Sequence, residues 1–149
     1  MPECGDGSGS SREGEEDIME KVPPKTRYKW VGFRESATDG DLPSLRESIG
    51  KLDDRLRIRL AAYLRTGVCV MEVEEEGFDL MDASVALPPV SFLSDGEWVW
   101  QNDVAHYVET YRAAVPAEFV AKAIDAVQVD RSRVDANEVE NWIFHHFFR

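Results

Sequence analysis

The sequence predicts an α+β fold: a small antiparallel sheet with a central hairpin, packed against three to four helices. The chain has 149 residues, 43% of them hydrophobic and 31% charged, which suits one globular domain with its own core. An Asp-Gly dipeptide between alternating apolar residues indicates the hairpin. Apolar residues at helical spacing, before and after that dipeptide, indicate the helices.

The N-terminal region divides into a tail and the start of the domain. Residues 1–24 are dominated by Gly, Ser and Glu and have no apolar period, so we expect a disordered acidic tail there and a single α+β domain over residues 25–149. Tyr28, Trp30 and Phe33 then favour a short edge strand or a packed extended arm.

The strongest helical pattern extends from Leu42 to Gly67. Asp41 can cap the free N–H groups of the first turn, and Gly67 is typical of the residue that follows a helix. Between them, aliphatic residues recur at spacings of three and four, which predicts one helix with a core-facing stripe. The stripe comprises Leu42, Leu45, Ile49, Leu52, Leu56, Leu60 and Leu64.

The middle of the chain favours strands. The β-branched run at 68–73 predicts a strand, the acidic stretch after it predicts a loop, and residues 85–87 favour another short strand before two prolines. In the hairpin, a two-residue loop at Asp95 and Gly96 predicts that Leu93 pairs with Trp98 and Phe92 with Val99.

That pairing assigns the hairpin side chains to two faces. Leu93, Trp98 and Trp100 are expected on one face of the sheet, and Phe92 and Val99 on the other. We expect both tryptophans to pack beneath helices; if exposed, they would be binding hot spots.

Three further helices are expected after the hairpin. Asn102 and Pro116 suit the starts of two of them, and Asp135 with Glu138 resembles a capping box that opens the last. The last helix continues through Phe147 with apolar residues all around it. It must therefore be covered, either by the rest of the chain or by a second protein.

The chain is strongly acidic, with a formal net charge of -12. The tail holds seven acidic and two basic residues, and six acids without a base lie between Glu72 and Asp82. Such a charge disfavours nucleic acid and anionic lipid and favours basic partners. Because the 42–67 helix is rich in Arg and Lys, the negative surface is expected around Glu72 to Asp82 and on the hairpin side.

The location predicted from the sequence is the cytoplasm, without a membrane partner. No apolar run approaches the roughly 18 residues needed to span a bilayer, and the first residues are polar and acidic. Cys4 lies in the tail and Cys69 in an apolar strand, so we expect the two cysteines not to pair.

No catalytic, cofactor-binding or metal-binding pattern is present in the sequence. His106, His145 and His146 do not form an HxH or HExxH motif, and the valines around Cys69 favour an inert thiol. The chain lacks a GxSxG motif and a phosphate-binding glycine loop. We therefore expect no enzymatic activity, no cofactor and no metal.

The acidic segment has two interpretations. It lacks the spacing of a calcium loop, so it is either a solvated loop or a decoy surface whose carboxylates mimic phosphates and dock on a basic protein. The candidate partner-binding residues are Glu72, Glu74, Glu75, Glu76, Asp79, Asp82, Asp95 and Glu97.

Three segments together resemble small bacterial immunity-type proteins associated with polymorphic or contact-dependent toxin loci. They are residues 62–67 (AYLRTG), residues 94–100 (SDGEWVW), and residues 107–111 followed by 116–119 (PAEF). His106 departs from the pattern, which often has a tyrosine there. The resemblance implies one-to-one blocking of a cognate toxin, frequently a nuclease with a basic cleft, and it implies no catalytic residues.

Three function classes follow. The leading hypothesis is an immunity or inhibitor protein that neutralises a bacterial toxin through its acidic surface. The alternative is an adaptor or regulatory subunit that binds a protein through the aromatic C-terminal helix. An enzyme is the third class, and a deep polar pocket enclosing His106 with two carboxylates would support it.

Overall fold

The computed structural model describes residues 28–37 and 41–146, so the expected tail at 1–24 lies outside the described residues. The α+β class is confirmed. The elements are β1 (Lys29–Val31), α2 (Arg34–Ala37), α3 (Leu45–Ser48), α4 (Asp54–Arg65), β2 (Val68–Glu72), β3 (Gly77–Asp79), β4 (Asp82–Leu87), β5 (Ser91–Ser94), β6 (Trp98–Gln101), α5 (Asp103–Tyr111), α6 (Ala117–Ala126), a short 3-10 helix (Arg131–Arg133) and α7 (Ala136–His146).

The main sheet has four strands in the order β1-β6-β5-β2, and the β5–β6 hairpin forms its centre as predicted. β5 is antiparallel to both β2 and β6. β1 differs from the expected antiparallel arrangement, because it pairs in parallel with β6. Parallel pairing requires the chain to return to the end of the sheet where β1 begins. The 66 residues between Val31 and Trp98 are long enough for that return.

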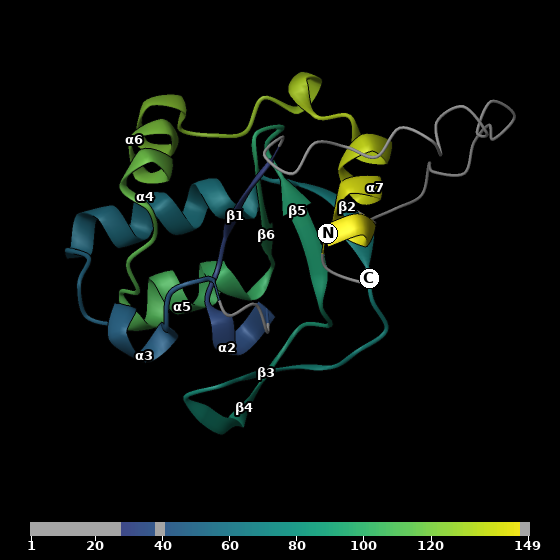
Figure 1. Ribbon diagram of the computed structural model, residues 1–149. Helices are drawn as coiled ribbons and strands as arrows, with labels where there is room; N and C mark the ends of the chain where they lie inside the picture. The colour runs from purple at the N-terminus through teal and green to yellow at the C-terminus, as the bar shows by residue number, and fades with distance from the viewer. Residues whose placement is uncertain (1–27, 38–40, 147–149) are drawn as a thin grey trace, which may run out of the picture.

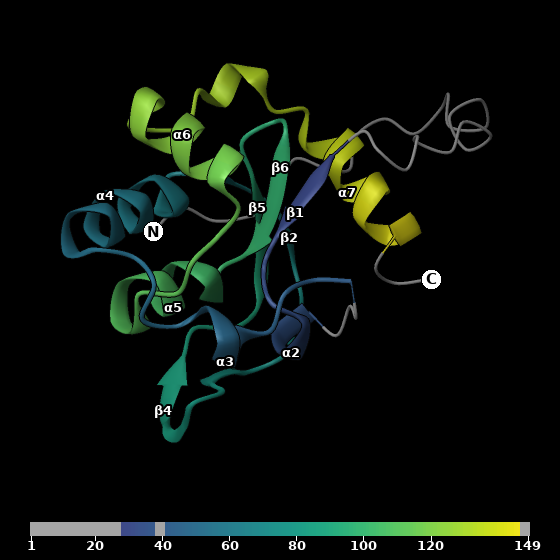
Figure 2. The same cartoon turned by 60° about the vertical axis from the view of Figure 1, so that its left-hand side comes forward.

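Helices cover both faces of this sheet. Figures 1 and 2 show α4, α5 and α6 on one side and α7 on the other. Trp98, Trp100 and the partly buried Leu93 belong to the core under α4–α6, whereas Phe92 and Val99 belong to a second core under α7. The predicted division of the hairpin between two faces is therefore confirmed, and the tryptophans are core residues.

The predicted hairpin register is wrong by two residues. Leu93 pairs with Trp100, Phe92 with Gln101, and Ser94 with Val99. The loop is longer than predicted because one carboxylate oxygen of Asp95 accepts hydrogen bonds from the backbone N–H groups of Glu97 and Trp98. A shift of two keeps every side chain on its predicted face, since strand side chains alternate with a period of two.

The single helix predicted over 42–67 is also wrong, because the chain leaves the helix between α3 and α4. Gly50 has a φ of 77°, a left-handed conformation that glycine adopts readily. Asp53 then caps α4 by accepting a hydrogen bond from the backbone N–H of Leu56 at 2.8 Å. Leu45 and Leu52 remain in the core on either side of the break.

The acidic stretch predicted as a loop contains a second sheet. β3 and β4 form an antiparallel pair that starts where Gly77 lies opposite Leu87 and ends at the turn between Asp79 and Asp82. We call residues 77–87 the β3–β4 arm. Figures 1 and 2 show the arm extending beyond the main sheet, below α5 and α3.

The last helix is covered by the chain itself. Asp135 caps it as predicted, accepting a hydrogen bond from the backbone N–H of Glu138 at 3.2 Å. Val139, Trp142 and Ile143 are buried against the main sheet. Phe144 is 48% exposed, and Phe147 lies outside the described residues.

Two further findings concern membrane-spanning helices and the cysteines. Within the described ranges, no helix is both long enough and apolar enough to cross a membrane. Cys69 is in a disulfide, so the prediction that this residue is unpaired is wrong. The other cysteine of the chain, Cys4, lies outside the described residues.

Candidate protein-binding site

A long stretch between α4 and the end of α5 contains acids but no lysine or arginine. Residues 66–111 hold ten acidic residues, and the nearest basic residues along the chain are Arg65 and Arg112. The acids are Glu72, Glu74, Glu75, Glu76, Asp79, Asp82, Asp95, Glu97, Asp103 and Glu109. Their position in the fold decides which of them can meet a partner.

An open cavity of about 380 Å³ lies among the first four of these acids. Its lining consists of Glu72, Val73, Glu74, Glu75, Glu76, Pro89 and Val90. The four glutamates are exposed, whereas Val73 and Val90 pack against the core under α7. The cavity therefore combines apolar side chains with a group of carboxylates.

Backbone hydrogen bonds join the two segments that line the cavity. The N–H of Val73 donates to the carbonyl of Val90 at 3.0 Å, and the N–H of Val90 donates to that of Glu75 at 3.1 Å. The sequence predicted that the Asn102 side chain caps α5, but it makes no such hydrogen bond. Its amide instead donates to the carbonyl of Pro89 at 2.9 Å. The cavity is thus held in place by Asn102, which lies between β6 and α5, as well as by its own segments.

The carboxylates at the cavity have no ion-pair partner among residues 28–37 and 41–146. None of the ion pairs between described residues involves Glu72, Glu74, Glu75 or Glu76. A lysine or arginine side chain of another protein fits such a site, because its aliphatic stem can lie on valine and proline while its charged end meets the carboxylates.

Asp79 lies in the interior, unlike its acidic neighbours. It is 1% exposed, and its Oδ2 accepts hydrogen bonds from His106 Nε2 and the Tyr111 hydroxyl, both at 2.8 Å. Its Oδ1 accepts from the backbone N–H groups of Met81 and Asp82. Asp79 therefore attaches the β3–β4 arm to α5 and is not available to a partner.

The hydrogen bonds also decide the ionisation of Asp79. Burial alone would raise its pKa, but the bonds from His106 and Tyr111 outweigh burial and hold the pKa below its ordinary value. Asp82, at the turn of the arm, is exposed, and its Oδ1 accepts from the Ser84 hydroxyl and backbone N–H. Its charge remains at the surface.

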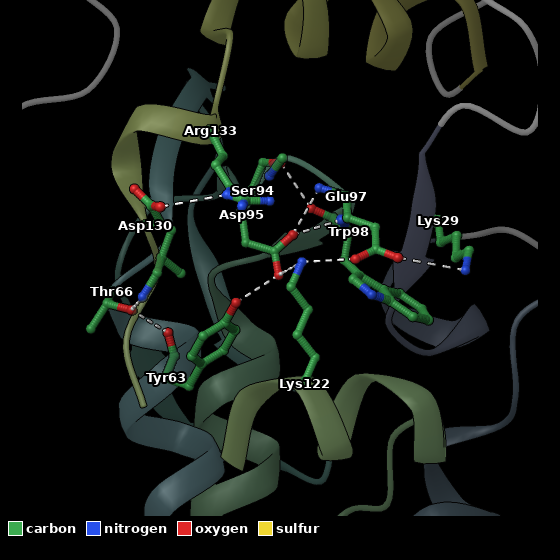
Figure 3. A network of polar contacts seen from close by, with 12 residues as sticks. Lys29, Tyr63, Thr66, Ser94, Asp95, Glu97, Trp98, Lys122, Asp130 and Arg133 are labelled. Atoms are coloured by element: carbon green, nitrogen blue, oxygen red, sulfur yellow. Dashed lines mark hydrogen bonds and ion pairs between the residues drawn. The ribbon is translucent and has the colours of Figure 1, made fainter. Parts of the chain in front are cut away.

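Asp95 is a second buried carboxylate, at the β5–β6 turn. Figure 3 shows it between Tyr63 and Lys122, which lie 2.8 and 3.2 Å from its Oδ2. Burial, followed by the hydrogen bond to Asp95, holds the pKa of Tyr63 far above its ordinary value. Asp95 thus joins α4 and α6 to the turn.

Glu97 is exposed but paired with cations of its own chain. Lys122 Nζ lies 2.8 Å from its Oε1, and Lys29 Nζ lies 3.8 Å from its Oε2 (Figure 3). The same lysine of β1 lies over the Trp98 ring. The negative charge of this turn is therefore largely balanced at the surface.

The fold separates the eight predicted site residues into three groups. Four glutamates line the cavity, which lies next to the start of β5. Asp95 and Glu97 lie in the turn that follows the end of that strand. Asp79 and Asp82 belong to the arm between the cavity segments. The apolar lining of the cavity was missed, although Pro88 and Pro89 in the sequence already indicated an interruption of pairing there.

His106 lies beside two carboxylates. Its Nε2 donates a hydrogen bond to Asp79 Oδ2 at 2.8 Å, and its side chain does not line the cavity described above. Asp103 lies one turn earlier; burial raises its pKa, and its Oδ2 accepts from the Ser36 hydroxyl. In residues 28–37 and 41–146, no group of three His, Cys, Asp or Glu residues is placed to hold a metal ion.

Comparisons of the chain with protein-family models, with curated proteins and with solved structures gave no match. The functional argument therefore depends on this chain's own residues.

Proposed function

We propose that this chain is an immunity or inhibitor protein that binds and neutralises a cognate bacterial toxin with a basic surface, such as a nuclease domain. One observation carries the proposal: four exposed glutamates, which form no ion pair with another described residue, line an open cavity with apolar sides. The resemblance of residues 62–67, 94–100, 107–111 and 116–119 to immunity-type proteins supports the same function.

The mode of action follows from the charge. A nuclease holds its phosphate substrate with Lys and Arg side chains, and carboxylates placed on those side chains compete with phosphate. Ten acids in residues 66–111, without one basic residue among them, also attract such a surface over long range. The inhibitor needs no catalytic group for this action.

The alternative function, an adaptor that uses the C-terminal helix, has less support. The apolar side chains Val139, Trp142 and Ile143 face the chain's own sheet, and Phe144 is the exposed aromatic residue that α7 retains within the described part. We therefore keep the acidic cavity as the proposed site.

The proposed function includes the cytoplasmic location that we expect from the sequence. The disulfide of Cys69 argues against that location, since disulfides are more usual in oxidising compartments. Cell fractionation, with thiols alkylated at lysis, tests this part independently of binding.

Co-expression with the product of the neighbouring gene tests the function. The proposal expects a one-to-one complex on purification at low salt, and survival of cells that the gene product alone kills. If the gene product is toxic and this chain neither binds it nor protects the cells, the proposal is wrong.

A further inference from the structure

The β3–β4 arm exposes two large apolar side chains next to the acidic cavity. Phe78 is 55% exposed and Leu80 is 39% exposed, whereas most large apolar side chains of the main sheet are buried. Ala86, which lies opposite Phe78 on β4, is exposed as well. The arm therefore presents an apolar surface to solvent.

The exposed Phe78 and Leu80 lie on either side of the buried Asp79, the last residue of β3. Asp79 lies between them and points inwards, where His106, Tyr111 and two backbone N–H groups hold its carboxylate. The backbone N–H of Leu80 also donates to the Tyr107 hydroxyl at 3.0 Å. These contacts attach Asp79 and the backbone of Leu80 to α5, so the exposed side chains of Phe78 and Leu80 are carried on a segment that the fold holds in place.

The base of the arm adjoins the residues that line the cavity. Glu76 and Pro89 line the cavity, and the arm begins at Gly77 and ends at Leu87, which pair with each other. The backbone of Pro88 approaches Gly77 so closely that a Cβ atom added at Gly77 would lie 2.4 Å from the carbonyl oxygen of Pro88. The base of the arm is therefore fixed against the cavity segment.

We propose that Phe78, with Leu80 beside it, is the apolar anchor of the partner interface. It enters an apolar hollow on the partner, and Lys or Arg side chains around that hollow meet Glu74, Glu75, Glu76 and Asp82. Charge complementarity identifies this occupant, because the acids that flank the arm have no basic residue between them in the chain. An aromatic side chain held in one position loses little freedom on binding, which suits a hot spot. The inference rests on the proposed function.

The experiment compares two single variants in binding to the purified product of the neighbouring gene. Phe78→Ala removes the anchor, and Phe144→Ala removes a similarly exposed aromatic side chain from α7. We expect Phe78→Ala to raise the dissociation rate roughly thirtyfold while the association rate stays within about threefold, because a hot spot acts mainly on dissociation. Phe144→Ala should leave both rates within about twofold. Thermal unfolding of both variants checks that each is folded.

The possible outcomes distinguish an error in the proposed anchor from an error in the proposed function. If the wild-type chain binds and Phe78→Ala dissociates at the wild-type rate, the anchor is wrong and the proposed function stands. If the wild-type chain does not bind, the proposed function itself fails. If Phe78→Ala instead converts a self-associated free protein to a monomer and leaves toxin binding unchanged, the occupant is a second copy of this chain, which overturns the proposal.

Discussion

At the scale of single residues, Asp79 makes the contacts on which the arm depends. Four donors from its own turn and from α5 surround a carboxylate that is almost fully buried. Asp79→Asn keeps the size but removes the charge, and it turns one acceptor into a donor that faces other donors. We expect a loss of about 2–3 kcal/mol in the free energy of unfolding, measured by urea denaturation. Asp125→Asn on α6, an exposed acid, should change it by less than about 0.5 kcal/mol.

The contribution of Asp79 should depend on pH in a defined direction. Its pKa is lower in the folded chain than in the unfolded chain, so its carboxylate stabilises the fold above the unfolded value, about 3.9. That contribution is lost as the pH falls through the unfolded pKa towards the folded one. The difference in stability between wild type and Asp79→Asn should be full at pH 7 and shrink below about pH 4. A difference that grows in acid contradicts this assignment.

The sequence predicted where the acids are but not what each one does. Glu74 and Asp79 belong to the same acidic run, yet one is exposed and the other is buried. The distinction depends on His106 and Tyr111, which lie 27 and 32 residues further along the chain. Asp95 was likewise predicted as a surface residue, and its partner Tyr63 lies 32 residues earlier. Contacts between such distant residues leave no periodic signal in the sequence.

At the scale of elements, two glycines with positive φ define two turns and allow a matched test. Gly50 has a φ of 77°, and a Cβ atom added there would meet no non-neighbouring atom within 4 Å. Gly96 has a φ of 98°, and a Cβ atom there would lie 2.5 Å from the Arg133 carbonyl oxygen. Gly50→Ala should cost about 1 kcal/mol from backbone conformation alone. Gly96→Ala should cost roughly 2–4 kcal/mol, because a backbone clash adds to the conformational cost. Equal losses in thermal unfolding would contradict the account of the hairpin turn.

The C-terminal helix provides a second test at this scale. Trp142 is buried between α7 and the sheet, where its ring lies 5.4 Å from that of Tyr28. Trp142→Ala should lower the free energy of unfolding by about 3–5 kcal/mol, and Phe144→Ala by less than about 1 kcal/mol. Near-equal effects of the two substitutions would indicate that α7 is not part of the core.

The elements were predictable where the pattern was local. The two faces of the hairpin follow from alternation alone, and they are confirmed even though the register is not. The break between α3 and α4 was missed because Leu45, Leu52 and Leu56 keep helical spacing across it. Gly50 and Asp53 were the signals of that break, a turn residue followed by a cap. The β3 strand was missed because charged residues surround its one large apolar residue, Phe78.

At the scale of the whole molecule, the acids differ in whether the fold neutralises them. Lys122 and Lys29 balance the charge at the β5–β6 turn, and Arg65 pairs with Glu109 of α5 at 2.7 Å. Within the described part of the chain, the cavity glutamates have no such ion pair. The predicted acidic surface around Glu72 to Asp82 is therefore narrowed to the cavity and the exposed side of the arm, which is where we propose that the partner binds.

The most direct measurement of the central claim is the association rate with the purified product of the neighbouring gene, at about 50 mM and about 500 mM salt. The triple variant Glu74→Gln, Glu75→Gln, Glu76→Gln removes three charges at the cavity. A control variant, Glu47→Gln, Asp125→Asn, Glu140→Gln, removes three charges from α3, α6 and α7 and so has the same net charge.

We predict that the cavity variant associates roughly tenfold more slowly than wild type at low salt, and that this difference shrinks at high salt. The control variant should stay within about threefold of wild type at both salt concentrations. Equal slowing of the two variants would mean that only net charge matters. An unchanged rate for the cavity variant would mean that these three glutamates do not meet the partner, and either result contradicts the proposed site.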